Sequence, residues 1–209
     1  TRVVFVANPN NPTGTLASKD ELRRFVDAVP ANVLLALDEA YIEFLADPAD
    51  FVSEIRDGKR QNVVIMRTFS KIFGLAGLRL GYGIAHPDLI SAFEKIRQPF
   101  NINAIAQAGA LAALTDDEHT TRTRDNNAAG LRYFETACHE LKLEIIPSAA
   151  NFLLLKVGEG QRVFDALQRE GVITRPMGGY QLPEWIRISV GTPAENQRCV
   201  TALKKVLGL

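Results

Sequence analysis

Three short apolar runs, each followed by polar residues, constrain the fold of this chain more than any other feature. The runs are Val3–Ala7, Val33–Asp38 and Val63–Arg67, and an amphipathic helical pattern at Ser18–Val29 separates the first two. None of them alternates apolar and polar residues, which is typical of parallel strands covered by helices on both faces. The pattern predicts an α/β fold built from βαβ units around a mostly parallel sheet, with Leu80–Ala85 as a candidate fourth strand.

The second half of the chain has a different pattern of predicted helices and strands. Ala104–Leu114 and Asp116–Leu141 predict two helices, and we expect the longer one to bridge two domains. Behind them, a smaller α+β unit is indicated by strands at Asn151–Val157, Val172–Arg175 and Trp185–Val190 and helices at Gly160–Glu170 and Pro193–Leu207. We therefore expect a large domain at residues 1–97, interdomain helices at 98–142 and a small domain at 143–209.

Composition excludes several classes of protein. The 209 residues carry 24 basic and 24 acidic side chains, so the formal net charge is zero. There is no general basic field to attract nucleic acid or an anionic membrane, and no apolar run approaches the roughly 18 residues of a membrane span. Cys138 and Cys199 lie far apart without metal-ligand spacing, which favours reduced thiols in a cytoplasmic protein.

The chain opens at Thr1, without Met, and runs directly into its first expected strand. Nothing resembling a natural start precedes it, so we expect that sequence is missing before Thr1.

A different kind of polar functional group follows each of the three apolar runs. The first leads to an amide-rich segment at Asn8–Gly14, the second to Asp38 and Tyr41, and the third to Lys71. In open parallel sheets ligands bind beyond the carboxyl ends of the strands, so these groups should meet. A buried lysine is costly unless its amine is used. An amine, a carboxylate, a phenol and an amide together favour a site for an aldehyde cofactor, and pyridoxal 5′-phosphate (PLP) fits best.

Chemistry assigns a role to each group in such a site. Lys71 can bond to the cofactor aldehyde and, once displaced by substrate, can move the substrate proton. Asp38 can hold the pyridine nitrogen protonated, so that the ring accepts electrons. The ring phenolate would be bound by Tyr41 and Asn11, and the phosphate by Arg79, Thr68 and Ser70.

Each motif alone has a plainer interpretation. Asn-Pro-Thr-Gly is a turn signal, Asp38 could cap a helix, and Lys71 with Arg79 could be a solvated surface pair. Their conjunction, in order and at strand ends, favours the cofactor site. The nearby glycines match neither a dinucleotide fingerprint nor a Walker phosphate loop, which argues against a nucleotide-binding α/β protein.

At this point the chain resembles the fold-type I PLP-dependent aminotransferases. Three segments carry the resemblance: Asn-Pro-Asn-Asn-Pro-Thr-Gly at 8–14, Asp-Glu-Ala-Tyr at 38–41 and Ser-Lys-x-Phe-Gly-Leu-Ala-Gly-Leu-Arg-x-Gly-Tyr at 70–82. The resemblance implies the fold of that class of transferase, with a remnant of its large domain and a C-terminal small domain. It implies the same roles for the cofactor residues named above and, for the full-length enzyme, a homodimer.

The C-terminal segments narrow the resemblance. Gly171–Met177 and Trp185–Thr192 closely resemble those of histidinol-phosphate aminotransferases. That implies that Arg187 binds the substrate α-carboxylate as a bidentate fork. It also implies that Arg175 binds the phosphate of histidinol phosphate or the distal carboxylate of glutamate. Asn151 is either a substrate-side or a structural residue.

The resemblance spans nearly all of this chain but only the C-terminal part of such an enzyme. The absent part carries the small-domain arm, a Gly/Ser segment at the phosphate and an aromatic residue stacked on the pyridine ring. We expect an aminotransferase that exchanges an amino group between histidinol phosphate and 2-oxoglutarate, using small-molecule partners only. An aromatic aminotransferase, a PLP-dependent phospho-amino-acid decarboxylase and an incompetent fragment that does not bind PLP remain open alternatives.

Overall fold

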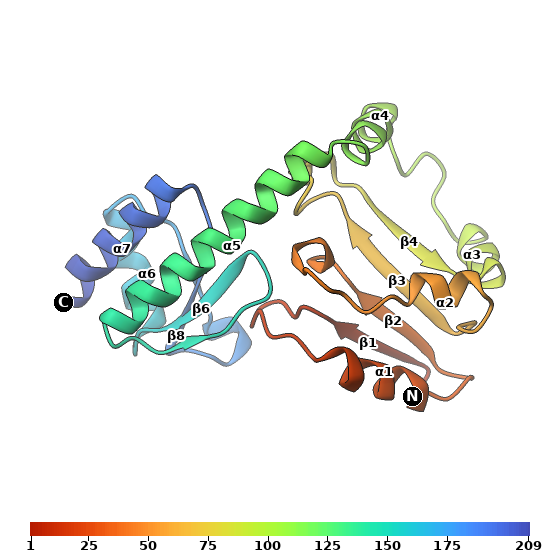
Figure 1. Ribbon diagram of the computed structural model, residues 1–209, viewed down its shortest axis with the longest axis horizontal. Coiled ribbons are helices and arrows are strands. Elements are labelled where there is room, and N and C mark those ends of the chain that lie inside the picture. The colour runs from red at the N-terminus through yellow and green to blue at the C-terminus, as the bar shows by residue number, and fades with distance from the viewer. The chain divides into compact units, whose positions relative to one another are not determined.

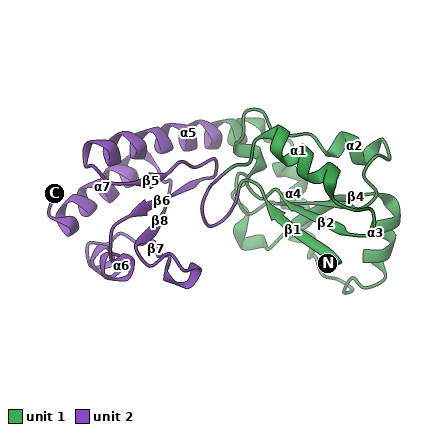
Figure 2. Ribbon diagram, turned by 90° about the horizontal axis from the view of Figure 1, so that it is seen from below, with its two compact units in different colours: residues 1–9, 16–121 green, residues 10–15, 122–209 purple.

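The computed structural model describes residues 1–209, which divide into two compact units. The first unit comprises residues 1–9 and 16–121, and the second comprises residues 10–15 and 122–209 (Figure 2). The loop at 10–15 therefore belongs with the C-terminal part of the chain, although it follows the first strand in sequence. The expected domain limits at 97 and 142 stay a prediction.

The first unit is built on a four-stranded sheet with the order β1-β2-β3-β4 (Figure 1). Its strands are β1 (Val3–Ala7), β2 (Leu34–Asp38), β3 (Val63–Thr68) and β4 (Gly81–Ala85). β1, β2 and β3 run parallel, and β4 pairs with β3 in the antiparallel sense. The predicted mostly parallel sheet is confirmed.

Two helices cover one face of this sheet. In α1 (Lys19–Ala28), Ser18 and Glu21 form a capping box, and Leu22 and Val26 are buried against β2 and β3. The five-residue α2 (Val52–Arg56) adds Ile55 to the same core. A helix this short gives no periodic signal, which explains why the sequence did not reveal it.

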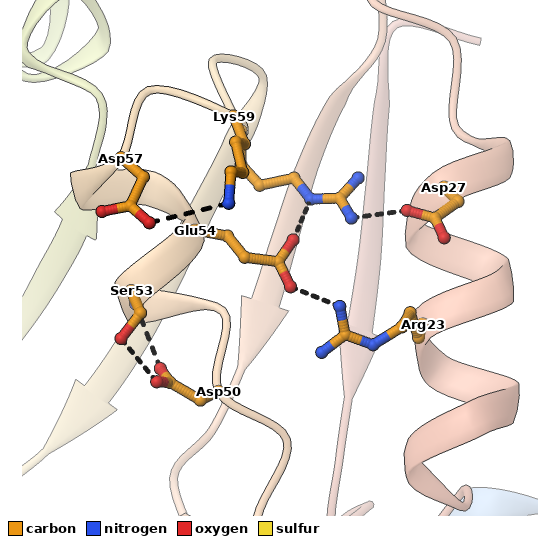
Figure 3. Close-up of polar contacts among 8 residues, drawn as sticks. Arg23, Asp27, Asp50, Ser53, Glu54, Asp57 and Lys59 are labelled. Atoms are coloured by element: carbon orange, nitrogen blue, oxygen red, sulfur yellow. Dashed lines mark hydrogen bonds and ion pairs between the residues drawn. The ribbon is translucent and has the colours of Figure 1, made fainter.

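Ion pairs join α1 to α2. Glu54 of α2 accepts from Arg23 Nη1 of α1 at 2.5 Å and from Arg60 Nε at 2.7 Å, and Arg60 also reaches Asp27 of α1 (Figure 3). Such pairs are individually weak at a surface, but three in one network fix the orientation of α2.

The remaining helices of the first unit lie between its later strands or after β4. They are the short 3₁₀ helices η1 (Ile42–Phe44) and η2 (Ala76–Leu78), then α3 (Pro87–Glu94) and α4 (Ala104–Ala113). Ala106 and Ala110 of α4 pack against Phe69 and Leu80, which bracket the segment that contains Lys71. The long α5 (Asp117–Glu140) begins in the first unit and continues into the second.

The second unit contains an antiparallel sheet with the order β5-β6-β8-β7. Its strands are β5 (Ile145–Ile146), β6 (Phe152–Lys156), β7 (Arg175–Pro176) and β8 (Trp185–Ser189). Helices α6 (Gly160–Arg169) and α7 (Pro193–Leu207) pack with α5 on the face that carries Leu153, Leu155, Ile186 and Ile188. η3 (Gly178–Tyr180) connects β7 to β8. Because side chains alternate along a strand, Leu154 and Arg187 lie on the opposite face.

One expected strand is wrong. Only Arg175 and Pro176 of the region around the predicted Val172–Arg175 strand pair with β8. Before Arg175 the chain diverges from β8, and residues of both segments line a pocket of about 300 Å³. Pro176 contributes no N–H to the ladder, so the pairing that remains is short.

Both cysteines carry free thiols, as predicted, and both are buried. None of the helices is long and apolar enough to cross a membrane.

Candidate functional site

The carboxyl ends of β1, β2 and β3 bring the polar clusters of the first unit to one edge of its sheet. Ala7, the last residue of β1, pairs with Asp38, the last residue of β2, and Asp38 pairs with Met66 near the end of β3. The parallel arrangement places Asp38 and Thr68 at neighbouring strand ends. This is the edge where ligands bind in sheets of this kind.

Lys71 lies in a tight turn after β3. Within this turn the N–H of Gly74 donates to the carbonyl of Lys71 at 3.0 Å, and the N–H of Leu75 donates to that of Phe69 at 2.9 Å. The half-buried Lys71 extends its Nζ atom over the buried ring of Tyr41, 5.1 Å from the ring centroid. No carboxylate forms an ion pair with this amine. The structure thus brings together the amine and the phenol that the sequence singled out.

Asp38 presents one carboxylate oxygen without a partner from the chain. Its Oδ1 atom accepts the N–H of Ala40 at 3.0 Å, which fixes the orientation of the carboxylate. The other oxygen accepts no hydrogen bond from the chain. A half-satisfied, half-buried carboxylate can accept a further N–H from a ligand.

The three residues expected at a phosphate follow β3 or precede β4. Thr68 Oγ1 accepts the N–H of Ser70 at 3.0 Å, so both hydroxyl-bearing residues belong to one turn. Arg79 is exposed and adopts a left-handed backbone, with φ of 53°. Its Nη1 donates to the carbonyl of Ala76 at 2.8 Å. That conformation is uncommon for a residue with a side chain, and such strain is concentrated at functional sites.

The sequence did not predict that Glu39, the neighbour of Asp38, would be a buried acidic residue. Glu39, only 3% exposed, accepts from Arg67 Nε at 2.9 Å, and Arg67 also interacts with Tyr82, its cross-strand neighbour on β4. Burial raises the pKa of Glu39, and the adjacent guanidinium only partly offsets this. The signal in the sequence was the acidic pair Asp38-Glu39, whose second member points to the interior.

The second unit gathers another group around Arg187 of β8. Its Nη1 donates to Asn11 Oδ1 at 2.5 Å, and its guanidinium lies over the ring of Phe152, 4.7 Å from the centroid. Arg175 of β7 stands directly opposite Arg187 in the ladder. The structure therefore brings together both predicted substrate arginines. Phe152 was not predicted as a site residue, although it follows the candidate residue Asn151 directly.

The loop at 10–15 is held so that Asn11 reaches Arg187. The carbonyl of Gly14 accepts the N–H of Ala149 at 2.8 Å. Gly14 has φ of 76°, and a Cβ atom there would lie 2.2 Å from Ser148 Oγ. Only glycine fits this approach. Asn151, the remaining predicted residue, accepts the N–H of Val190 through its backbone carbonyl at 2.9 Å, and the role of its side chain stays a prediction.

The predicted site residues thus form two groups. Asp38, Tyr41, Thr68, Ser70, Lys71 and Arg79 belong to the first unit, whereas Asn11, Asn151, Arg175 and Arg187 belong to the second. Asn11 was expected beside Tyr41 at the phenolate, and the contact that the structure gives its side chain is with Arg187.

Comparison with known proteins gives one consistent family. The family model described as "Aminotransferase class I and II" matches residues 1–203. A histidinol-phosphate aminotransferase from Akkermansia muciniphila is 54% identical over 207 residues, covering 99% of this chain and 56% of that protein. Histidinol-phosphate aminotransferase 2 from Ralstonia nicotianae is 49% identical over 211 residues, with the same coverage.

A solved structure agrees with these relatives. It is the histidinol-phosphate aminotransferase from Sinorhizobium meliloti in complex with pyridoxal-5′-phosphate, which superposes with a TM-score of 0.90 at 33% identity. The match covers 99% of this chain and 57% of that one. The chain therefore spans a little over half the length of the proteins it matches.

Proposed function

Because the chain belongs to the class I and II aminotransferases, we propose that the whole protein is a PLP-dependent enzyme that exchanges an amino group between histidinol phosphate and 2-oxoglutarate. The names of its relatives support the first substrate. The observation that carries the proposal is the half-buried Lys71 amine over the Tyr41 ring, without a counter-ion, at the edge where Asp38 also ends its strand. A cytoplasmic homodimer acting on small molecules is part of the same proposal.

The residues present fit PLP group by group. An aldehyde needs an amine, a pyridine nitrogen needs a carboxylate, and a phosphate needs hydroxyls and a guanidinium. Lys71 has an amine without an ion-pair partner, and Asp38 keeps one carboxylate oxygen for an N–H donor. Thr68, Ser70 and Arg79 add two hydroxyls and an exposed guanidinium.

Bound PLP supplies an aldehyde that bonds to amines and a ring that accepts electrons from the substrate Cα. Asp38 would accept the N–H of the ring nitrogen through its open carboxylate oxygen and so favour the protonated ring. Lys71 Nζ, freed once the substrate amine takes its place, would accept the proton from the substrate Cα as general base and donate it to C4′ of the cofactor as general acid. Tyr41 limits the positions that the Lys71 amine can reach, because the buried Tyr41 ring lies beneath that amine.

The paired arginines suit two unlike substrates. Arg187 has a fork of donors that matches a carboxylate in bidentate fashion, and Asn11 and Phe152 hold its guanidinium in one orientation. Arg175, directly across the ladder, offers a second cation to a distal anion. We assign the phosphate of histidinol phosphate and the distal carboxylate of the oxo acid to this second position.

Replacing Lys71 with alanine in the whole protein tests the cofactor assignment. The near-visible absorbance of lysine-bound PLP should disappear, and borohydride should no longer fix cofactor mass on the peptide that contains residue 71. Lys95→Ala is the matched control, because Lys95 is an exposed lysine outside the site. An unchanged spectrum in Lys71→Ala would refute the assignment.

A substrate profile decides among the open alternatives. High activity with histidinol phosphate supports the proposal, whereas preference for aromatic amino acids, or release of carbon dioxide from a phospho-amino acid, favours the other two enzymes. Titrating this 209-residue chain alone with PLP shows whether the cofactor groups described suffice without the rest of the protein.

A further inference from the structure

We propose that His119 is a positioning residue for Lys71, and that its imidazole holds in place the peptide group between Ile72 and Phe73, one residue beyond the lysine. His119 lies in the first turn of α5, and its Nε2 atom is 3.0 Å from the carbonyl oxygen of Ile72. A carbonyl can only accept, so Nε2 carries the proton and donates. The consequence for catalysis rests on the function proposed for Lys71, whereas the holding of the turn does not.

This contact differs in origin from the others that shape the turn. The hydrogen bonds from Gly74 to Lys71 and from Leu75 to Phe69 are local and close the turn on itself. The bond to His119 comes from an element 47 residues further along the chain. Ile72, whose carbonyl it binds, has a fully buried side chain. Ile72, the residue that follows Lys71, is thus held both by apolar packing of its side chain and by a hydrogen bond to its carbonyl.

The imidazole also lies close to a second residue of the turn. Gly74 has φ of 70°, and a Cβ atom built on it would lie 3.7 Å from both Cε1 and Nε2 of His119. The imidazole edge therefore lies near Gly74, and the space between them is about that of a single methyl group.

His119 is itself held firmly enough to act on the turn. Its backbone N–H donates to Asp116 Oδ1 at 2.9 Å, which caps the first turn of α5. A displacement of that first turn would be passed through the imidazole to the carbonyl of Ile72, next to Lys71 in the chain. A lysine amine that is displaced and must return during each catalytic cycle needs its backbone kept in place, because small misplacements of catalytic groups are costly in rate.

Two substitutions of His119 in the whole protein separate the donor from the bulk of the side chain. Gln can place an N–H where Nε2 stands, whereas Met fills similar space without a donor. In His119→Met, amide hydrogen exchange at Gly74 and Leu75 should accelerate about fivefold, the effect of losing a hydrogen bond of ordinary strength. Exchange in β2 and β3 should not change, and His119→Gln should restore the native rates. His139→Met, an exposed position in the same helix, is the matched control.

The rate at which PLP becomes fixed to Lys71 provides the functional readout. Borohydride trapping over time should show slower attachment in His119→Met than in the native protein, and near-native attachment in His119→Gln, with kcat reduced more than KM changes. Native exchange at Gly74 and Leu75 in His119→Met would overturn the positioning role. If the native protein attaches no PLP while the exchange effect is present, the proposed function fails and the positioning of the turn stands.

Discussion

Arg175 and Arg187 stand directly opposite each other on the antiparallel strands β7 and β8. Side chains at such positions lie on the same face with Cβ atoms about 5 Å apart, and like charges there destabilise a sheet. The arrangement is unfavourable unless an anion lies between or beside the two guanidinium groups. It is therefore a better indication of substrate binding than either arginine alone.

Arg175→Gln should relieve this repulsion. We expect the unfolding free energy in low-salt buffer to stay level or to rise by up to about 1 kcal/mol, the scale of a cross-strand pair. Inorganic phosphate should raise the melting temperature of the native protein by mass action and raise that of the variant less. Thermal unfolding with and without phosphate checks both effects, and Arg169→Gln, exposed on α6, serves as control. An equal phosphate response in Arg175→Gln and native protein would count against an anion site.

Arg187→Lys tests the carboxylate fork. A lysine keeps the charge but can neither reproduce the planar fork nor lie over Phe152 while donating to Asn11. Losing a hydrogen bond to a charged group costs about 1.5–3 kcal/mol, so kcat/KM of the whole protein for histidinol phosphate should fall roughly 10- to 100-fold. Steady-state kinetics would measure this fall in kcat/KM, with Arg169→Lys as the control variant. A native kcat/KM in Arg187→Lys would remove Arg187 from the substrate site.

The fold of the first unit could be predicted because its signals are local. Uninterrupted apolar runs predicted the strands of a covered parallel sheet, and the helical patterns at Ser18–Val29 and Pro193–Leu207 located α1 and α7. The polar residues at the strand ends could be placed at one edge because parallel strands share that edge.

What the sequence could not reveal depends on pairing between distant segments. The register that sets Arg175 opposite Arg187 follows from where β7 joins β8, and the expected Val172–Arg175 strand had the wrong limits. The contact from Asn11 to Arg187 spans 176 positions, and that from His119 to Ile72 spans 47. Neither contact produces a periodic pattern or a compositional bias in the sequence.

Gly14→Ala should disrupt the loop that carries Asn11. The new Cβ atom would fall 2.2 Å from Ser148 Oγ and 2.7 Å from its Cβ, and φ of 76° is itself unfavourable for alanine. We expect the free energy of unfolding in urea to fall by about 2 kcal/mol or more. Gly58→Ala is the control, since Gly58 has φ of 75° but nothing within 4 Å of an added Cβ. Equal losses in the two variants would show that strain in φ, and not the close approach to Ser148, limits position 14.

The two buried thiols should make stability depend on pH in the alkaline range. Burial raises the pKa of Cys138 to about 11 and that of Cys199 to about 12, from 9.0, and Cys138 contributes to the shift at Cys199. Above pH 9 the unfolded chain loses thiol protons that the folded protein keeps. The folded state then binds more protons, so the free energy of unfolding must fall as pH rises.

Between about pH 9 and 11 this decline approaches 1.4 kcal/mol per pH unit for each thiol. Urea unfolding across this range should show a steep slope for the native protein and a shallower one for Cys138→Ala with Cys199→Ala. The absolute stability of the double variant will be lower because it contains cavities, so the slopes are the quantity to compare. Iodoacetamide should leave both thiols unmodified in the folded protein at pH 8 and modify both in urea. Parallel slopes, or rapid alkylation without urea, would show that these thiols ionise in the folded state as readily as in the unfolded chain.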